Sequence, residues 1–422
     1  MILPNDFTSY TRSLFGEELY RDFLLALDAD PPVSIRINPY KPVEMHDDVQ
    51  EHCEHVPWCN YGFYLASRPN FTFDPLFHAG CYYVQEASSM FLAHVMQQYV
   101  SGDVQMLDLC AAPGGKSTCA RSMLSADSVL ICNEPIRKRA SVLAENVEKF
   151  DAPNMYVTNL YPQEITALFK GKQSIVNGQR SKTDCQLLKP YFDVILADVP
   201  CSGEGMFRKD ETAVREWSPS APERCATLQR QIVSDIWPCL RPGGLLIYST
   251  CTFNTHENEE NVRWICSALG ARLLPIDVHE DWHICGSLLD GFHEPVYRFI
   301  PGRTRGEGLF MAVLRKDAGA ETITSFKDIS LPIMEWKNKS LPKDLEHDSL
   351  PSCEVDYYQA LHYLRREAIA LPKETPRGEV VITYQGQRLG LAKNVGNRAN
   401  NLYPKEWAIR TTYLPSTPFS LF

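Results

Sequence analysis

The stretch VQMLDLCAAPGGKST, residues 104–118, decides the fold. Its apolar residues predict a buried strand that ends at Asp108, and Pro113-Gly114-Gly115 then stops the strand and lets the backbone turn tightly. A helix is expected to begin near Gly115. Adjacent glycines at such a turn let a ligand approach the main chain, and the free N–H groups of a first helical turn favour a carboxylate or a phosphate.

The glycine spacing matches neither of the common nucleotide-binding loops. GxGxxG needs separated glycines, and the Walker loop needs four residues before Gly-Lys-Ser/Thr, so Gly115-Lys116-Ser117 does not predict an ordinary P-loop. A second apolar run, 128–131, leads to Glu134, about twenty residues after the glycines, where a doubly wound fold places its ribose-binding acid. Together they predict a nucleoside-type ligand, and a plain βαβ turn with a solvated glutamate is the alternative.

Strand and helix patterns alternate through the middle of the chain. Strands are expected at 106–109, 129–132, 155–158, 192–197, 244–249 and 308–315. A mostly parallel sheet follows, and ligands of such sheets bind beyond the carboxyl ends of the strands. That edge would gather Asp108, Glu134, Asn159, Asp198 and Thr250-Cys251. Asn159 is the weakest of these candidates, because an asparagine after a strand more often caps a loop.

Smaller units are expected on both sides of this core. Residues 7–27 predict an amphipathic helix, and 33–38 alternate like a strand with Arg36 on its polar side; they form either a small α/β module or a cap on the core. Residues 80–99 predict a helix whose start, Gln85-Glu86, could line the site.

The C-terminal part of the chain predicts a separate β-rich unit. The patterns indicate an exposed insertion at 171–189, a helix at 354–370 and short strands at 380–384, 387–391 and 408–412. We therefore expect an N-terminal α/β module at 1–75, a core at 76–316, a bridging segment at 317–370 and a C-terminal domain at 371–422.

Composition limits the function classes. A formal charge of −10 argues against a protein that coats nucleic acid indiscriminately, whereas the excess of basic residues in 371–422 favours selective contact with it. No signal peptide or membrane-spanning run is present in the sequence, so a cytoplasmic location is expected. The 14 cysteines include no CxxC pair, and His52, Cys53, His55 and Cys59 lack paired ligand spacing; we expect reduced thiols and no metal.

Two cysteines are expected at the ligand-binding edge. Asp198 ends one strand and is followed by Pro200-Cys201, while Cys251 ends the next strand. Either cysteine alone would more often be a small buried apolar residue. Beside a nucleoside-type ligand, however, a thiolate can add to C6 of a cytosine, which makes the poorly nucleophilic C5 able to take a methyl group from a sulfonium.

Three segments resemble signature motifs of the RNA 5-methylcytosine methyltransferases of the Nol1/Nop2/Sun class. They are LDLCAAPGGKST at 107–118, DVPCSGEGMFR at 198–208 and YSTCTFNTHENEE at 248–260. The resemblance includes residues 34–38, 83–90 and 306–308. The C-terminal Gly390, Lys393, Gly396, Arg398, Asn400-Asn401 and Tyr403-Pro404 are similar to the PUA-like end of the bacterial, RsmF-type branch that methylates small-subunit ribosomal RNA.

The resemblance implies an α/β fold with a Rossmann-like class I methyltransferase core, a small N-terminal α/β module and a β-rich PUA-like C-terminal domain. It implies S-adenosyl-L-methionine held by Cys110, Ala111, Ala112, Pro113, Gly114, Gly115, Lys116, Glu134, Asn159 and Asp198. Cys251 would be the nucleophile, Cys201 the helper in its release, and Asp198 the acid that acts at N3 of the base. The implied partner of a monomeric enzyme is RNA, either 16S ribosomal RNA or the small ribosomal subunit.

Two positions depart from the family pattern. Asn159 stands where some relatives have an acid after the third strand, and Gly302 stands where the family often has histidine.

Two other functions stay open. A catalytically silent RNA-binding or assembly protein would not need the two cysteines, and neither would an amino or oxygen methyltransferase.

Overall fold

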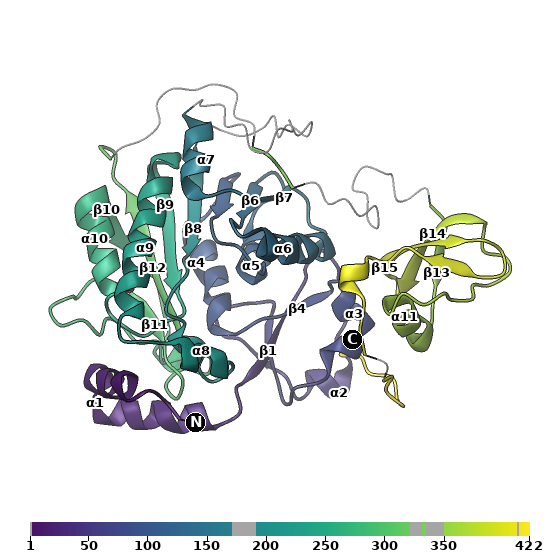
Figure 1. The fold of residues 1–422 in the computed structure, drawn as a ribbon, viewed down its shortest axis with the longest axis horizontal. Helices are drawn as coiled ribbons and strands as arrows, with labels where there is room; N and C mark the ends of the chain where they lie inside the picture. The colour runs from purple at the N-terminus through teal and green to yellow at the C-terminus, as the bar shows by residue number, and fades with distance from the viewer. Residues whose placement is uncertain (1, 171–190, 321–330, 335–349, 412) are drawn as a thin grey trace.

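A computed structural model describes residues 2–170, 191–320, 331–334, 350–411 and 413–422. Three sheets follow one another along the chain, and the largest, in the middle, is flanked by helices (Figure 1). The predicted insertion at 171–189 and most of 317–349 lie outside the described residues.

The central sheet has eight strands in the order β10-β12-β9-β8-β5-β6-β7, with β11 paired to β12. Its strands are β5 Gln105–Asp108, β6 Val129–Asn133, β7 Met155–Thr158, β8 Phe192–Asp198, β9 Leu240–Thr250, β10 Ala271–Leu274, β11 Tyr297–Phe299 and β12 Leu309–Lys316. The strands from β9 to β7 are parallel, whereas β12 pairs antiparallel with β9. All six predicted core strands are confirmed, and the predicted mostly parallel sheet with them.

Helices cover both faces of this sheet. They are α4 Phe91–Tyr99, α5 Gly115–Met123, α6 Arg137–Phe150, α7 Pro162–Phe169, α8 Glu211–Glu216, α9 Ala221–Ile236 and α10 Glu259–Leu269. Met106 of β5 packs in one core with α4, α5 and α6, whereas its neighbour Leu107 packs in another with α7, α9 and α10. Since successive strand residues point to opposite faces, burial on both sides explains the nearly continuous apolar runs.

The N-terminal unit is a four-stranded antiparallel sheet in the order β2-β3-β1-β4. Its elements are α1 Asn5–Asp28, β1 Val33–Ile37, α2 Asp47–Gln50, β2 Glu54–His55, β3 Gly62–Leu65, α3 Pro75–His78 and β4 Tyr82–Val84. Helix α1 confirms the prediction for 7–27, although Gly16 interrupts it with a φ of 72°. Its Phe7, Phe15 and Phe23 pack on Phe207 and Phe253 of the core.

Two predictions for this unit are wrong. Arg36 is only 1% exposed. Its strand, β1, lies between β3 and β4, and the Arg36 guanidinium is covered by α5 and Phe150. Residues 80–99 are not one helix, because β4 pairs with β1 and Glu86 then accepts hydrogen bonds from the N–H groups of Ser88 and Ser89. The α-helix begins only at Phe91.

The C-terminal unit is a sheet in the order β13-β14-β15-β16 with one helix. Its elements are β13 Ser352–Glu354, α11 Tyr357–Leu364, β14 Gly378–Tyr384, β15 Gln387–Asn394 and β16 Ala399–Asn401. Strand β13 and α11 fall within the range expected to bridge the domains, yet they share a core with β14. A capping box of Asp356 and Gln359 starts α11, which is shorter than predicted. Residues 408–411 form no strand, contrary to prediction, and residue 412 is not described.

Candidate active site

The turn after β5 is built as the glycine pattern predicts. Gly114 has a φ of 114° and α5 begins at Gly115. Asp108 is fully buried; its Oδ2 accepts a hydrogen bond from Ser117 Oγ (2.6 Å), while its Oδ1 has no hydrogen-bond partner. Burial raises the pKa of Asp108 to about 7, and the hydrogen bond from Ser117 only partly offsets this. One oxygen of this buried carboxyl group is therefore without a hydrogen-bond partner at the edge of the sheet.

Gln85 lies on the other side of the same turn. A Cβ at Gly115 would lie 3.2 Å from the Tyr83 ring and 3.7 Å from Gln85 Nε2, so these side chains approach the glycine closely. Gln85 is 4% exposed; its Oε1 accepts from Arg36 Nε (2.7 Å), and its Nε2 has no hydrogen-bond partner. Because arginine only donates, Arg36 fixes the amide so that its NH₂ group stays available beside Gly115.

Helix α6 and its preceding loop hold the residues of 110–113 in place. Ala111 N–H donates to Asn133 O (2.8 Å), Arg139 to Ala112 O (2.9 Å), and Asn146 to Pro113 O (2.7 Å). Burial raises the pKa of the Cys110 thiol, so this cysteine stays protonated. The loop backbone is thus fixed, whereas its glycines leave the main chain accessible.

Glu134 and Asn159, the two candidates that follow β6 and β7, differ in whether their polar atoms are available to a ligand. Glu134 is 1% exposed; its Oε1 accepts from Ile136 N–H (2.9 Å), and its Oε2 lies 3.3 Å from an Arg139 nitrogen. The Asn159 side chain donates to the backbone oxygens of Glu134 (2.7 Å) and Pro135 (2.8 Å). Asn159 therefore holds the Glu134 loop, as its capping interpretation suggested.

Asp198 ends β8 next to the glycine turn. Its Oδ2 lies 2.9 Å from Lys116 Nζ, and its Oδ1 accepts from Ser249 Oγ (2.7 Å). Burial opposes the charge of Lys116, but the Asp198 carboxylate outweighs it and raises the lysine pKa. Lys116 therefore joins the glycine turn to the acid, and about 30% of the Asp198 side chain stays exposed.

The two thiols meet. Cys201 Sγ and Cys251 Sγ lie 3.2 Å apart, and both residues are half-buried. The hydrogen bond with Cys251, burial, and the negative charges of Cys251 and Glu257 all raise the pKa of Cys201 well above its ordinary value. The Cys201 thiol therefore favours its protonated form, and Lys116 is close enough to Cys251 to interact with it electrostatically. Sheet order places these thiols, then the glycine turn, Glu134 and Asn159 along one edge.

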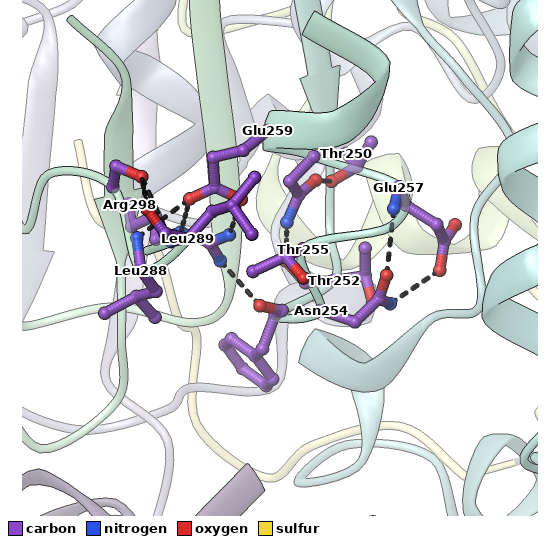
Figure 2. A network of polar contacts seen from close by, with 12 residues as sticks. Thr250, Thr252, Asn254, Thr255, Glu257, Glu259, Leu288, Leu289 and Arg298 are labelled. Atoms are coloured by element: carbon purple, nitrogen blue, oxygen red, sulfur yellow. Dashed lines mark hydrogen bonds and ion pairs between the residues drawn. The ribbon is translucent and has the colours of Figure 1, made fainter. Parts of the chain in front are cut away.

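Buried carboxylates hold the two cysteine loops together. Glu204 accepts from the N–H groups of Phe253 (2.8 Å) and Asn254 (3.1 Å), and Glu257 accepts from Ser202 N–H (3.0 Å). Figure 2 shows how the segment after β9 continues this network. Arg298 binds Glu259 through two nitrogens and donates to Phe253 O (2.7 Å), so a buried ion pair supports the Cys251 loop from behind.

The sequence did not identify these buried carboxylates as supporting residues. Glu204 and Glu257 lie within the motif segments, but nothing in a sequence distinguishes a buried carboxylate from a solvated one. Gly205 fills a related role: its N–H donates to Cys251 O (2.8 Å), and a Cβ there would lie 2.9 Å from Gly308 Cα. This contact explains why Gly308 belongs to the resemblance.

A family model described as 16S rRNA methyltransferase RsmB/F matches residues 96–315, more than half of the chain. The chain belongs to this family. The RsmB/F core is flanked by matches to the N-terminal domain of 16S rRNA methyltransferase RsmF at 3–87 and to the methyltransferase RsmF PUA domain at 351–409. The predicted family and PUA-like C-terminal domain are thereby confirmed.

This chain is matched over nearly its whole length by related proteins. It is 29% identical to the ribosomal RNA small subunit methyltransferase F of Cronobacter sakazakii, with 86% of each chain covered. The protein of the same name from Escherichia coli O7:K1 is 26% identical, with 96% of each covered. Among solved structures, NSun6 from Pyrococcus horikoshii with SFG is 20% identical and has a TM-score of 0.58, covering 74% of this chain and 98% of that chain. This likeness confirms the class I methyltransferase fold.

Two other features of the described residues bear on function. None of them forms a cluster of three or more histidine, cysteine or acidic side chains arranged to hold a metal ion. Cys59, from the segment weighed as a metal site, hydrogen-bonds with Cys119, which lowers its pKa to about 7.

Among the helices in the described ranges, none combines the length and the apolar character needed to cross a membrane.

Proposed function

We propose that this RsmB/F-family methyltransferase transfers a methyl group from S-adenosylmethionine to C5 of a cytosine in 16S ribosomal RNA. The observation that carries the proposal is the Cys201–Cys251 pair, 3.2 Å apart, beside the Lys116–Asp198 pair at the carboxyl edge of the sheet. Methylation of an amino or hydroxyl group needs no thiol, whereas C5 of cytosine must first be activated.

The residues at the glycine turn fit S-adenosylmethionine. Gln85 Nε2 and Asp108 Oδ1 are buried without hydrogen-bond partners, one a donor and the other an acceptor. Such a pair suits a ligand that carries both a carboxylate and an ammonium group, and the first turn of α5 favours the carboxylate. The loop of 110–116, Glu134 and Asp198 would hold the remainder, with Asn159 acting through the Glu134 loop.

When bound, S-adenosylmethionine supplies a sulfonium methyl group that a carbon nucleophile can take. The chain's own residues create that nucleophile. The Cys251 thiolate forms a bond to C6, the electrons of the C5–C6 double bond shift toward C5, and a proton is held at N3. Asp198, oriented by Lys116 and Ser249, passes to N3 the proton that the Cys251 thiol loses when it becomes a thiolate.

Release reverses the addition. The proton on C5 must leave, and the C6–S bond must break with its electron pair returning to Cys251. Cys201 carries a proton next to the departing sulfur, since its raised pKa keeps it protonated. It gives this proton to the departing Cys251 sulfur, and the Cys201 thiolate that results takes the proton from C5. N3 returns its proton to Asp198, which leaves neutral 5-methylcytosine and two protonated thiols.

The test is methyl transfer in vitro. Purified protein, tritiated S-adenosylmethionine, and either 16S ribosomal RNA or isolated small subunits are combined, and the RNA is digested for mass spectrometry of nucleosides. We expect 5-methylcytosine at one position. Label in a methylated amino group or ribose would overturn the cytosine-C5 assignment, and RNA binding without any label would indicate the silent assembly protein.

A further inference from the structure

A cavity of about 870 Å³ opens where the N-terminal unit meets the core. Its wall comes from the segment after α1, the end of β3, Arg208, and the loop of 302–306. It is lined by four arginines and one acid: Arg68, Arg208, Arg303, Arg305 and Asp30. For a chain of net charge −10, this is a local concentration of positive charge.

The arginines differ in their availability. Arg208 is neutralised by Glu307 and donates to the backbone oxygens of Ala26 and Gly306, so it is structural. Arg305 pairs with Glu54 at 2.8 Å, but both side chains are about half exposed or more, and such a pair contributes little. Arg68 is exposed, and the described residues provide it with no carboxylate partner.

Aromatic rings support two of the exposed guanidinium groups. Arg305 lies 4.1 Å above the centre of the Tyr64 ring, and Arg68 lies 5.6 Å from that of Phe71. Such stacking restrains the guanidinium plane and leaves its N–H groups for an anion. A planar fork of donors matches a phosphate, which it can bind through two hydrogen bonds.

Gly302 is the position where this chain lacks the histidine common in its family. It has a φ of 87°, and a Cβ there would lie 2.3 Å from the backbone oxygen of Asp22 in α1. No larger residue fits unless α1 moves. Gly302 therefore lets α1 lie close against the loop that carries Arg303 and Arg305.

The cavity adjoins the thiol loops. Arg208 lies three residues after Gly205, which donates to the backbone oxygen of Cys251 and packs on Gly308. The loop that carries Gly306 lies against Ser88 and Glu86 of the segment before α4. RNA whose base reaches Cys251 would thus have its backbone near these arginines.

We propose that this cavity binds phosphates of the RNA strand next to the target nucleotide, through Arg68 and Arg305 with Arg303 beside them. The inference rests on the proposed function. Single-stranded and looped RNA is bound through phosphates and through stacked arginine planes, and the chain offers both here.

The test is binding of a 16S ribosomal RNA transcript by the full-length protein, measured by filter retention over a range of KCl concentrations. The double variant Arg68→Ala/Arg305→Ala should bind about tenfold more weakly, and the slope of log K against log salt should fall by about 0.7 for each lost phosphate contact. Glu54→Gln releases Arg305 and should tighten binding. Arg272→Ala, which removes an exposed arginine from β10, is the matched control and should change nothing.

The outcomes separate this inference from the proposed function. If the wild-type protein makes 5-methylcytosine while the double variant binds RNA with unchanged affinity and salt slope, the cavity assignment is overturned and the enzyme assignment stands. If the variant loses affinity for RNA while the wild type makes no 5-methylcytosine, the cavity binds RNA and the cytosine chemistry is wrong. Competition by polyglutamate as strong as that by polycytidylate would point to an acidic protein partner and overturn the assignment. Should the double variant not fold, Arg68→Ala decides alone.

Discussion

The polar groups in front of Cys251 and those behind it are organised differently. In front, at the cofactor edge of Gln85, Asp108, Lys116 and Asp198, two buried polar atoms lack hydrogen-bond partners. Behind, the loop scaffold of Glu204, Glu257, Glu259 and Arg298 is densely hydrogen-bonded. Figure 2 shows the part of it around Glu257, Glu259 and Arg298. An unpartnered buried polar group costs free energy, so it persists where a ligand satisfies it. Under the proposed function, the scaffold provides rigidity and the edge provides binding.

The largest expected effect is on the thiols between these two regions. Cys251→Ala should reduce methyl transfer by at least about a thousandfold, because it removes the proposed nucleophile that adds to C6. Cys201→Ala should leave addition possible but block release. A covalent protein–RNA adduct that survives denaturing electrophoresis is therefore expected for Cys201→Ala and not for Cys251→Ala. The opposite pattern would exchange the roles of the two cysteines.

The next effect tests the scaffold. Glu259→Gln leaves Arg298 buried and unpaired, which should lower the free energy of unfolding by about 3–5 kcal/mol in urea titrations. Replacing both partners, as in Glu259→Leu/Arg298→Met, should cost less than the single change. If Glu259→Gln is as stable as the wild type, the scaffold is not what holds the Cys251 loop.

At the cofactor edge, Gln85→Ala should weaken binding of S-adenosylmethionine by about ten- to a hundredfold, since a hydrogen bond to a charged group is lost. Isothermal titration calorimetry measures it without RNA. Gln85→Glu sharpens the test: it can still pair with Arg36, but it would repel a ligand carboxylate. Equal affinities of the wild type and Gln85→Glu would exclude Gln85 from the cofactor site.

The last prediction is a pH dependence of stability. Because burial raises the pKa of Asp108 to about 7, the folded state keeps a proton that the unfolded chain releases near its ordinary value of about 4. The free energy of unfolding should therefore fall as pH rises from about 4 to 7. Asp108→Asn removes this contribution, so denaturation curves of the two proteins should diverge across that window. Parallel curves would show that Asp108 titrates normally.

Local patterns predicted much of the core. Two glycines after an apolar run were enough to place the turn before α5, and strands buried on both faces have nearly continuous apolar sequences. This local reasoning failed where contacts between distant parts of the chain decide the structure. Residues 82–84 became a strand because β1 is beside them, and Arg36 was buried because α5 covers it. Periodicity within a segment carries no information about such neighbours.

The sequence by itself predicted the strands of a mostly parallel core and the arrival of Asp198, Cys201 and Cys251 at the carboxyl edge of its sheet, because strand ends and turn residues are local properties. Only the tertiary structure decided that the thiols lie 3.2 Å apart, that burial and Cys251 raise the pKa of Cys201, and that Gln85 is left as a donor beside Gly115. It also decided that arginines from distant segments share one cavity. Distances, burial and pKa values depend on groups far apart along the chain, and folding alone brings those groups together.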